Sequence, residues 1–305
     1  MSRTQFQVCY GRSVASVLLA LTMASGALAV SEATVWQKPH LKFTILHTFT
    51  GGKSDGGNPD GRLLKDSDGN LYGMVNGGGL YGYGAIYKLT THNGAFTFSL
   101  IHSFRKTEGN YPRDNNLMLK DGTLFGETQH GGTYGAGTIF SVRTDGSNFK
   151  TLHNFSGNDG ALPFGGLLGS DSRILYGTTL EGGMYGYGTV FEYSKGTLKT
   201  LVNLDLGTTG GAPPAGLNRD QDGNLWGTTT EGGSGGDGTV FEMTPQGAGG
   251  WHFAVVHNFS GSDGFFPGFG RLVFGRGGLV VGETQGGGSK GGGVVYGCLL
   301  YTSPS

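Results

Sequence analysis

The chain has 305 residues and a formal net charge of −1, and only 14% of its residues are charged, against about 25% in typical domains. No basic stripe could neutralise phosphates, so we expect no nucleic-acid partner. Glycine occupies 63 positions and recurs periodically between apolar residues, which indicates a folded repeat array rather than a low-complexity segment.

The first 29 residues have the form of a signal peptide. Arg3 and Arg12 make a basic start, Val14–Ala24 is mostly apolar, and Ala27–Ala29 supplies the small residues of a cleavage site. The apolar run is short for a membrane span, so we expect an exported protein without a transmembrane span in the mature chain. A retained N-terminal anchor is the alternative. Secreted, periplasmic and cell-surface locations all fit this prediction.

Residues 30–41 form a linker without periodicity, and residues 42–297 contain five copies of one pattern. The pattern begins with an aromatic residue or Val, followed by Gly, and then has four residues of any type before Gly-Gly. After two further residues come Gly-x-Gly and a small residue. It ends with Ile or Val followed by Phe or Tyr. Its first and last glycines are Gly73 and Gly84, Gly126 and Gly137, Gly177 and Gly188, Gly227 and Gly238, and Gly282 and Gly293. Their offset within a copy is always 11, which indicates one rigid supersecondary unit repeated five times.

Each unit predicts four short strands. One is rich in β-branched and aromatic residues and recurs at Lys42–Phe49, Phe98–Phe104, Lys150–Phe155, Lys199–Leu204 and Phe253–Phe259. An ordered turn follows, Gly-rich and ending in proline, as at Asp55–Pro59. A short apolar strand such as Leu63-Leu64 then leads to a hairpin turn, Asp-x-Asp-Gly-Asn at Asp66 and Asp220.

Past the hairpin, the motif itself supplies the last two strands. The Gly-Gly loop reverses the chain into outgoing strands at Ala85–Leu89, Thr138–Val142, Thr189–Tyr193, Thr239–Met243 and Val294–Tyr296. Four strands per unit of about 50 residues is typical of a β-propeller blade. We therefore predict an all-β propeller of about five four-stranded blades.

The N-terminal strand is the predicted closure of the ring. Lys42–Phe49 resembles the fourth, outer strand of a unit but precedes the first unit, whereas the fifth unit has no such strand. Pairing it with Val294–Tyr296 would remove both free edges.

The last eight residues, 298–305, match nothing in the repeats. They resemble the translated read-through of a sequencing adapter, and in that case the reading frame is truncated; a natural short tail is the alternative. Cys9 lies in the predicted signal peptide and Cys298 in this tail, so we expect no intrachain disulfide after processing.

These units resemble the tandem repeat of choice-of-anchor GloVer-type proteins of bacteria. Their diglycine is similar to that of kelch repeats, and Asp-x-Asp-Gly-Asn-Leu-Trp-Gly at Asp220–Gly227 resembles regulator-type propeller repeats. The resemblance covers residues 42–297 and implies an exported protein. It implies no established reaction and no catalytic residue.

Several polar residues recur from unit to unit. His47, His102, His153 and His257, with Asn203 in the remaining unit, are assigned structural roles, and a ring of metal ligands is the alternative. The Asp66 and Asp220 turns resemble the start of a calcium loop, but a hairpin fits better because Leu225-Trp226 lies in a predicted strand.

The Gly-Gly loops carry a candidate ligand-binding rim. It consists of Glu127, Thr128, Thr179, Glu181, Thr229, Glu231, Glu283 and Thr284. If these loops share one face, their oxygen atoms suit a hydroxyl-bearing ligand such as a glycan, whereas paired carboxylates would suit acid–base chemistry. Repetition alone also produces such rings. Tyr81, Tyr134 and Tyr185 could stack on sugar or pack against the next blade.

We therefore predict an exported propeller that acts as a non-catalytic binding or surface module, with carbohydrate or another surface protein as partner and no cofactor. Two alternatives stay open. An extracellular lyase or hydrolase would need broken symmetry, for which Asn203, Gly235, Asp237 and Lys290 are the candidates. A structural surface spacer would need no site. The sequence does not indicate an oligomeric state.

Overall fold

The computed structural model describes residues 43–112, 117–170, 174–268 and 270–299. The predicted signal peptide, the linker and residues 300–305 lie outside the described residues. The chain divides into two compact units at Leu46 and His47, and the fold below belongs to the second unit.

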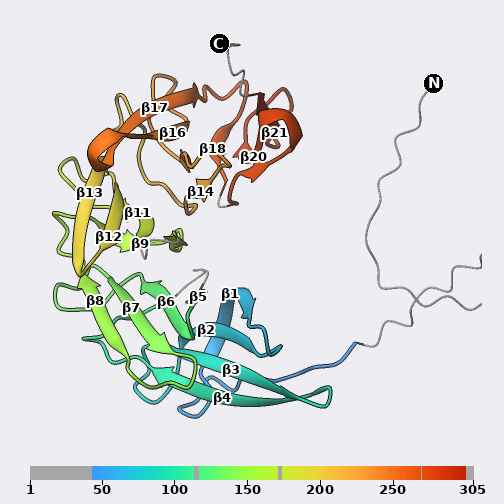
Figure 1. The fold of residues 1–305 in the computed structure, drawn as a ribbon. Helices are drawn as coiled ribbons and strands as arrows, with labels where there is room; N and C mark the ends of the chain where they lie inside the picture. The colour runs from blue at the N-terminus through green and yellow to red at the C-terminus, as the bar shows by residue number, and fades with distance from the viewer. Residues whose placement is uncertain (1–42, 113–116, 171–173, 269, 300–305) are drawn as a thin grey trace, which may run out of the picture. The chain divides into compact units, whose positions relative to one another are not determined.

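Five antiparallel sheets follow one another along the chain (Figure 1). The first contains β1 (Gly57–Lys65), β2 (Leu71–Gly77), β3 (Ala85–His92) and β4 (Ala95–Ser103), and the second β5 (Met118–Lys120), β6 (Thr123–Thr128), β7 (Thr138–Arg143) and β8 (Lys150–Asn154). The third contains β9 (Ala161–Pro163), β10 (Leu168–Gly169), β11 (Leu175–Glu181), β12 (Thr189–Ser194) and β13 (Thr197–Asn203). The fourth contains β14 (Asn218–Arg219), β15 (Leu225–Thr229), β16 (Thr239–Gln246) and β17 (Gly250–Asn258), and the fifth β18 (Phe265–Pro267), β19 (Val273–Phe274), β20 (Leu279–Gly286) and β21 (Val295–Leu299). The all-β prediction is confirmed, and each of the five sheets contains one copy of the motif.

The first glycine of the motif is required by a close cross-strand contact. Gly177 of β11 pairs with Phe191 of β12, and a Cβ built on Gly177 would lie 2.4 Å from the Phe191 ring. Real Cβ atoms do not approach a ring so closely, so the strand can carry only glycine here. The same contact pairs Gly126 with Phe140 and Gly227 with Phe241. The constant spacing of the motif is therefore the register of one β-hairpin.

The predicted outgoing strands are confirmed, and the N-terminal strand is not. Phe43–Phe49 carry no strand in the structure. Strand β21 pairs with β20 and extends to Leu299, so Cys298 belongs to a strand rather than to a separate tail.

The core is divided into clusters, and four of them lie between consecutive sheets. Tyr72, Met74 and Ile86 of the first sheet pack against Leu124 and Phe140 of the second. Equivalent clusters join the second sheet to the third, the third to the fourth and the fourth to the fifth. Each sheet thus buries apolar side chains against its neighbour along the chain, as expected for units that cannot cover their own faces.

Prolines complete the contacts between neighbouring sheets. A Cβ built on Gly137, the last motif glycine of the second unit, would lie 2.6 Å from Pro163 of the third. Leu162 precedes this proline with φ of 55°, and its amide donates to Ala136 O at 2.9 Å. A positive φ is unfavourable for a branched residue, so this hydrogen bond and the proline contact hold a strained backbone.

The first and fifth sheets differ from the others in what covers them. Leu63 is 49% exposed, whereas its equivalents Leu117, Leu167, Leu217 and Leu272 are at most 4% exposed. Val295 is 78% exposed, whereas its equivalents Ile86, Ile139, Val190 and Val240 are at most 2% exposed. Among the described residues, neither of these two positions has the covering neighbour that its equivalents have.

Candidate functional site

The Gly-Gly loops of the first four units are each fixed by a polar side chain at the end of their outer strand. Asn154 Oδ1 accepts from the Thr133 amide at 2.8 Å, and Asn203 Oδ1 accepts from the Met184 amide at 2.8 Å. Strand register makes the two residues equivalent, since Asn154 pairs with Thr138 and Asn203 with Thr189. The sequence-based match of Asn203 to the histidines is therefore wrong: Val202 occupies their position.

The histidines hold the entry turns of their units. Their Nε2 atoms lie 3.6, 3.2, 2.8 and 2.9 Å from a carboxylate in the pairs His47–Asp55, His102–Glu108, His153–Asp159 and His257–Asp263. Each acid also accepts from a backbone amide of its own turn, as Asp159 does from Ser156 at 2.8 Å. Among the described residues, no group of three or more His, Cys, Asp or Glu side chains has the arrangement of a metal site.

The Asp-x-Asp-Gly-Asn turns use their first carboxylate within the hairpin. Asp220 accepts from the amides of Asp222 and Asn224 at 2.9 Å each, and from Trp226 Nε1 at 2.9 Å. Asp66 has the same contacts, with Tyr72 Oη in place of the indole nitrogen. Because the turn itself saturates this carboxylate, the hairpin interpretation accounts for the motif.

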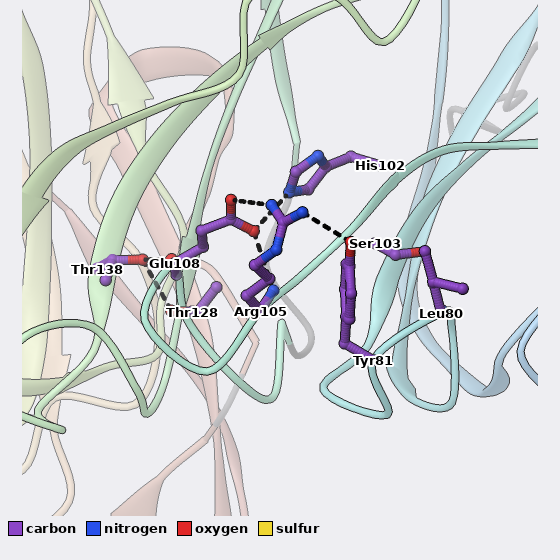
Figure 2. A network of polar contacts seen from close by, with 8 residues as sticks. All are labelled: Leu80, Tyr81, His102, Ser103, Arg105, Glu108, Thr128 and Thr138. Atoms are coloured by element: carbon purple, nitrogen blue, oxygen red, sulfur yellow. Dashed lines mark hydrogen bonds and ion pairs between the residues drawn. The ribbon is translucent and has the colours of Figure 1, made fainter.

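The junction between the first and second units brings an aromatic ring, a cation and an acid together (Figure 2). The Arg105 guanidinium lies 4.5 Å from the Tyr81 ring centroid, and its Nη2 donates to Tyr81 Oη at 2.7 Å. Its Nη1 lies 3.2 Å from Glu108 Oε1, and Glu108 Oε2 lies 3.2 Å from His102 Nε2. Burial lowers the pKa of His102, and the Glu108 carboxylate partly offsets that effect.

A cavity of about 310 Å³ opens beside these residues. Its walls are Leu80, Tyr81, Leu100, Ile101, His102, Ser103 and Arg105. Leu80 is held by its amide, which donates to Ser103 Oγ at 3.2 Å. A shallow cavity with one aromatic face and several polar groups is suited to bind a hydroxylated ligand.

Tyr134 and Tyr185 occupy the position of Tyr81 in the next two units. Tyr81 is 41% exposed, Tyr134 66% and Tyr185 54%. The arginine is not repeated, since Ser156 and Asp205 stand where the first junction has Arg105. In the fourth unit Gly235 replaces the tyrosine, and a Cβ there would collide with the Phe259 carbonyl. The aromatic positions thus extend over three units and end at the fourth.

The predicted rim separates into buried and exposed residues. Thr128, Thr179 and Thr229 are fully buried and Thr284 is nearly so. The hydroxyls of Thr179 and Thr189 lie 2.9 Å apart, and Thr179 Oγ1 also donates to Glu181 O at 3.0 Å. Glu181 and Glu231 are exposed near the ends of their strands. The threonines therefore bond within their own units.

Glu127 and Glu283 occupy a different repeat position from Glu181 and Glu231, directly after the first motif glycine. Glu283 is exposed, whereas Glu127 is fully buried and neither of its carboxyl oxygens has a hydrogen-bonding partner among the described residues. Burial raises the pKa of Glu127 to about 8, and the Arg271 charge opposes this rise. Sequence reasoning included Glu127 in the rim and missed its burial and its arginine neighbour.

The remaining candidates for broken symmetry carry no cluster of their own. Asp237 is half-buried, and its carbonyl accepts from the Phe266 amide at 3.2 Å. Lys290 is exposed on the fifth loop. No helix in the part of the chain that the structure describes is long and apolar enough to span a membrane.

Several solved structures are distantly similar to this chain. A chain of a nidogen/laminin complex shares 16% identity at a TM-score of 0.47, with 73% of this chain and 71% of that chain covered. A gluconolactonase from Xanthomonas campestris shares 15% identity at a TM-score of 0.44, covering 81% and 72%. A protein of unknown function from Dyadobacter fermentans shares 12% identity at a TM-score of 0.47, covering 82% and 84%. Similarities at this level assign neither an activity nor a ligand.

Among curated proteins, none matches the sequence significantly. The model of the Gloeobacter/Verrucomicrobia repeat matches residues 61–296, the region that contains all five copies of the motif. Since this match covers more than half of the sequence and the five sheets, the chain belongs to the Gloeobacter/Verrucomicrobia repeat family.

Proposed function

We propose that this protein is an exported β-propeller that binds carbohydrate through the loop face of its first three units and catalyses no reaction. The observation that carries the proposal is the exposure of Tyr81, Tyr134 and Tyr185 at equivalent loop positions. A tyrosine offers a flat apolar face together with a hydroxyl, and it loses little conformational entropy on binding. At the first junction, Arg105 and the His102–Glu108 pair add polar partners beside the ring.

The propeller architecture is part of this proposal. The sheets pack consecutively, and Arg271 of the fifth unit reaches Gly165 O of the third at 3.1 Å, which supports convergence of the units on one axis. Leu63 and Val295 are the two exposed members of otherwise buried sets. Closure of the fifth sheet against the first would bury both, and Phe43–Phe49 would then pair with β21.

A glycan array probed with the full chain, with and without calcium, tests the binding function. We expect retention of a carbohydrate class independent of calcium, and at least tenfold weaker binding after Tyr81→Ala, Tyr134→Ala and Tyr185→Ala are combined. Met184→Ala, an exposed apolar residue beside Tyr185, is the matched control. If the triple variant binds as tightly as the parent chain, the tyrosines do not form the binding site. If the parent chain binds no glycan, the result favours a structural spacer.

An extracellular polysaccharide enzyme is the rival function, and Glu127 is the observation that favours it. A general acid needs a raised pKa, and that of Glu127 is about 8. Its oxygens are closed to solvent, however, and a hydrolase needs a second group on the other side of the bond. Turnover of a bound glycan that is lost in Glu127→Gln would establish the enzyme.

A further inference from the structure

A second polar cluster lies where the first strands of the units converge. Arg271, just before β19, donates from Nη2 to Gly165 O at 3.1 Å and from Nη1 to Leu217 O at 3.4 Å. One guanidinium of the fifth unit therefore contacts the third and fourth units. Its Nε atom is buried and has no partner among the described residues.

Glu127 joins this cluster from the second unit. Its carboxyl group lies against the third unit, where a Cβ on Gly177 would come within 3.1 Å of Oε1. The charge of Arg271 opposes the rise in the pKa of Glu127 that burial causes. Since its pKa is about 8, Glu127 is mostly a neutral carboxylic acid at pH 7, and it has one proton to donate.

Two threonines add hydroxyl groups at the repeat position of Glu127. Thr178 and Thr228 each follow the first motif glycine of their unit, and the Oγ1 atoms of both are buried without a partner in the described part of the chain. Buried polar groups are nearly always hydrogen-bonded, because an unsatisfied one loses its bonds to water without replacement. Glu127, Thr178 and Thr228 thus present buried, unsatisfied polar atoms at one repeat position of three consecutive units, and Arg271 has an unsatisfied buried nitrogen.

The charge of the cluster is positive. Arg62 occupies in the first unit the repeat position that Arg271 occupies in the fifth. Burial is the main cause of the lowered pKa of Arg271, and the charge of Arg62 lowers it further. The charge of Glu127 opposes this lowering. Arg62 is exposed and makes no hydrogen bond or ion pair with any residue that the structure describes. The nearby acid is Glu283, whose Oε1 lies 3.3 Å from a Cβ built on Gly270. Arg62 and Arg271 thus bring two guanidinium groups to the cluster, against the one exposed carboxyl group of Glu283.

We propose that this convergence point is a binding site for a hydroxylated carboxylate, such as a uronic acid. Arg62 and Arg271 would hold the ligand carboxylate, while Glu127, Thr178 and Thr228 would pair with its hydroxyls. Arg271 gives up a carbonyl contact to open the site, because a carboxylate is a stronger acceptor for a guanidinium than a peptide oxygen. The site does not depend on the loop tyrosines.

Titration calorimetry of the full chain with glucuronate tests this site. We expect saturable binding of glucuronate and none of glucose, which lacks the carboxylate. Inorganic phosphate and acetate are the comparison anions, and both should bind at least tenfold more weakly because they cannot use the hydroxyl partners. Phosphate binding as tight as that of glucuronate would overturn the assignment of a hydroxy acid. Failure of glucuronate to saturate would overturn the site itself.

Variants separate the site from the fold. Arg62→Gln changes an exposed side chain and should leave the melting temperature unchanged while weakening glucuronate at least tenfold. Arg143→Gln, at the exposed end of β7, is the matched control and should bind as the parent does. Binding that Arg62→Gln leaves unchanged would contradict the proposal. The combined tyrosine variant should retain glucuronate binding, so failure of the loop site and of this site are distinguishable.

Discussion

At the residue scale, one glycine per unit is fixed by the ring that covers it. Gly177→Ala should destabilise the protein by about 2–4 kcal/mol, because the new methyl group meets the Phe191 ring at 2.4 Å inside a buried sheet. Urea unfolding of the variant measures this loss. Gly247→Ala is the control, since a Cβ there meets no atom within 4 Å. Equal stability of the two variants would refute the steric explanation of the motif.

Glu127 should make the protein less stable as the pH rises. The pKa of Glu127 is raised in the folded state to about 8, from an ordinary value of 4.5, so the folded state binds more protons than the unfolded state between these values. Its contribution is fully present below pH 4.5 and is lost as the pH rises through 8, by an amount on the order of a few kcal/mol.

Glu127→Gln should flatten this dependence between pH 5 and pH 8. The measurement is the free energy of unfolding at several pH values for the parent and the variant. Glu181→Gln removes an exposed carboxylate from the end of β11 and should leave the slope as it is in the parent. A parent chain whose stability is constant over this range would show that Glu127 is ionised in the folded state.

At the scale of the element, the hairpins depend on a single carboxylate. Asp220→Ala removes the acceptor of two turn amides and of the Trp226 indole, and should cost about 2–3 kcal/mol. Asp222→Ala, an exposed change in the same turn, should cost less than about 0.5 kcal/mol. Thermal unfolding of both variants provides the test. A small loss in Asp220→Ala would leave room for the calcium-loop alternative, which added calcium would then reveal.

The strands and their pairing show which features the sequence alone predicts. The motif predicts the outgoing strands because Gly177 and Phe191 mark a cross-strand pair that is local in sequence. Asn203 was matched to the histidines because letters alone do not give strand register, which the pairing with Thr189 decides. Glu127 and Arg271 were not predicted as neighbours, since their proximity depends on how four units converge rather than on any local pattern.

At the scale of the whole molecule, the exposed positions Leu63 and Val295 test the proposed ring. If the fifth sheet closes on the first in solution, Leu63→Asp and Val295→Asp should each cost about 2 kcal/mol or more, because each would place a charge in an apolar contact. Met184→Asp changes an exposed loop residue and should be nearly neutral. If both end variants are as stable as the Met184 variant, the ring is open in solution.

The apolar clusters between consecutive sheets determine how the molecule would unfold under mechanical force. Each cluster joins neighbours along the chain, so a pull on the two ends would load these contacts one after another. The protein should therefore extend in steps of about fifty residues, one module at a time, rather than in a single rupture. Such stepwise extension would absorb tension while the remaining sheets stay folded.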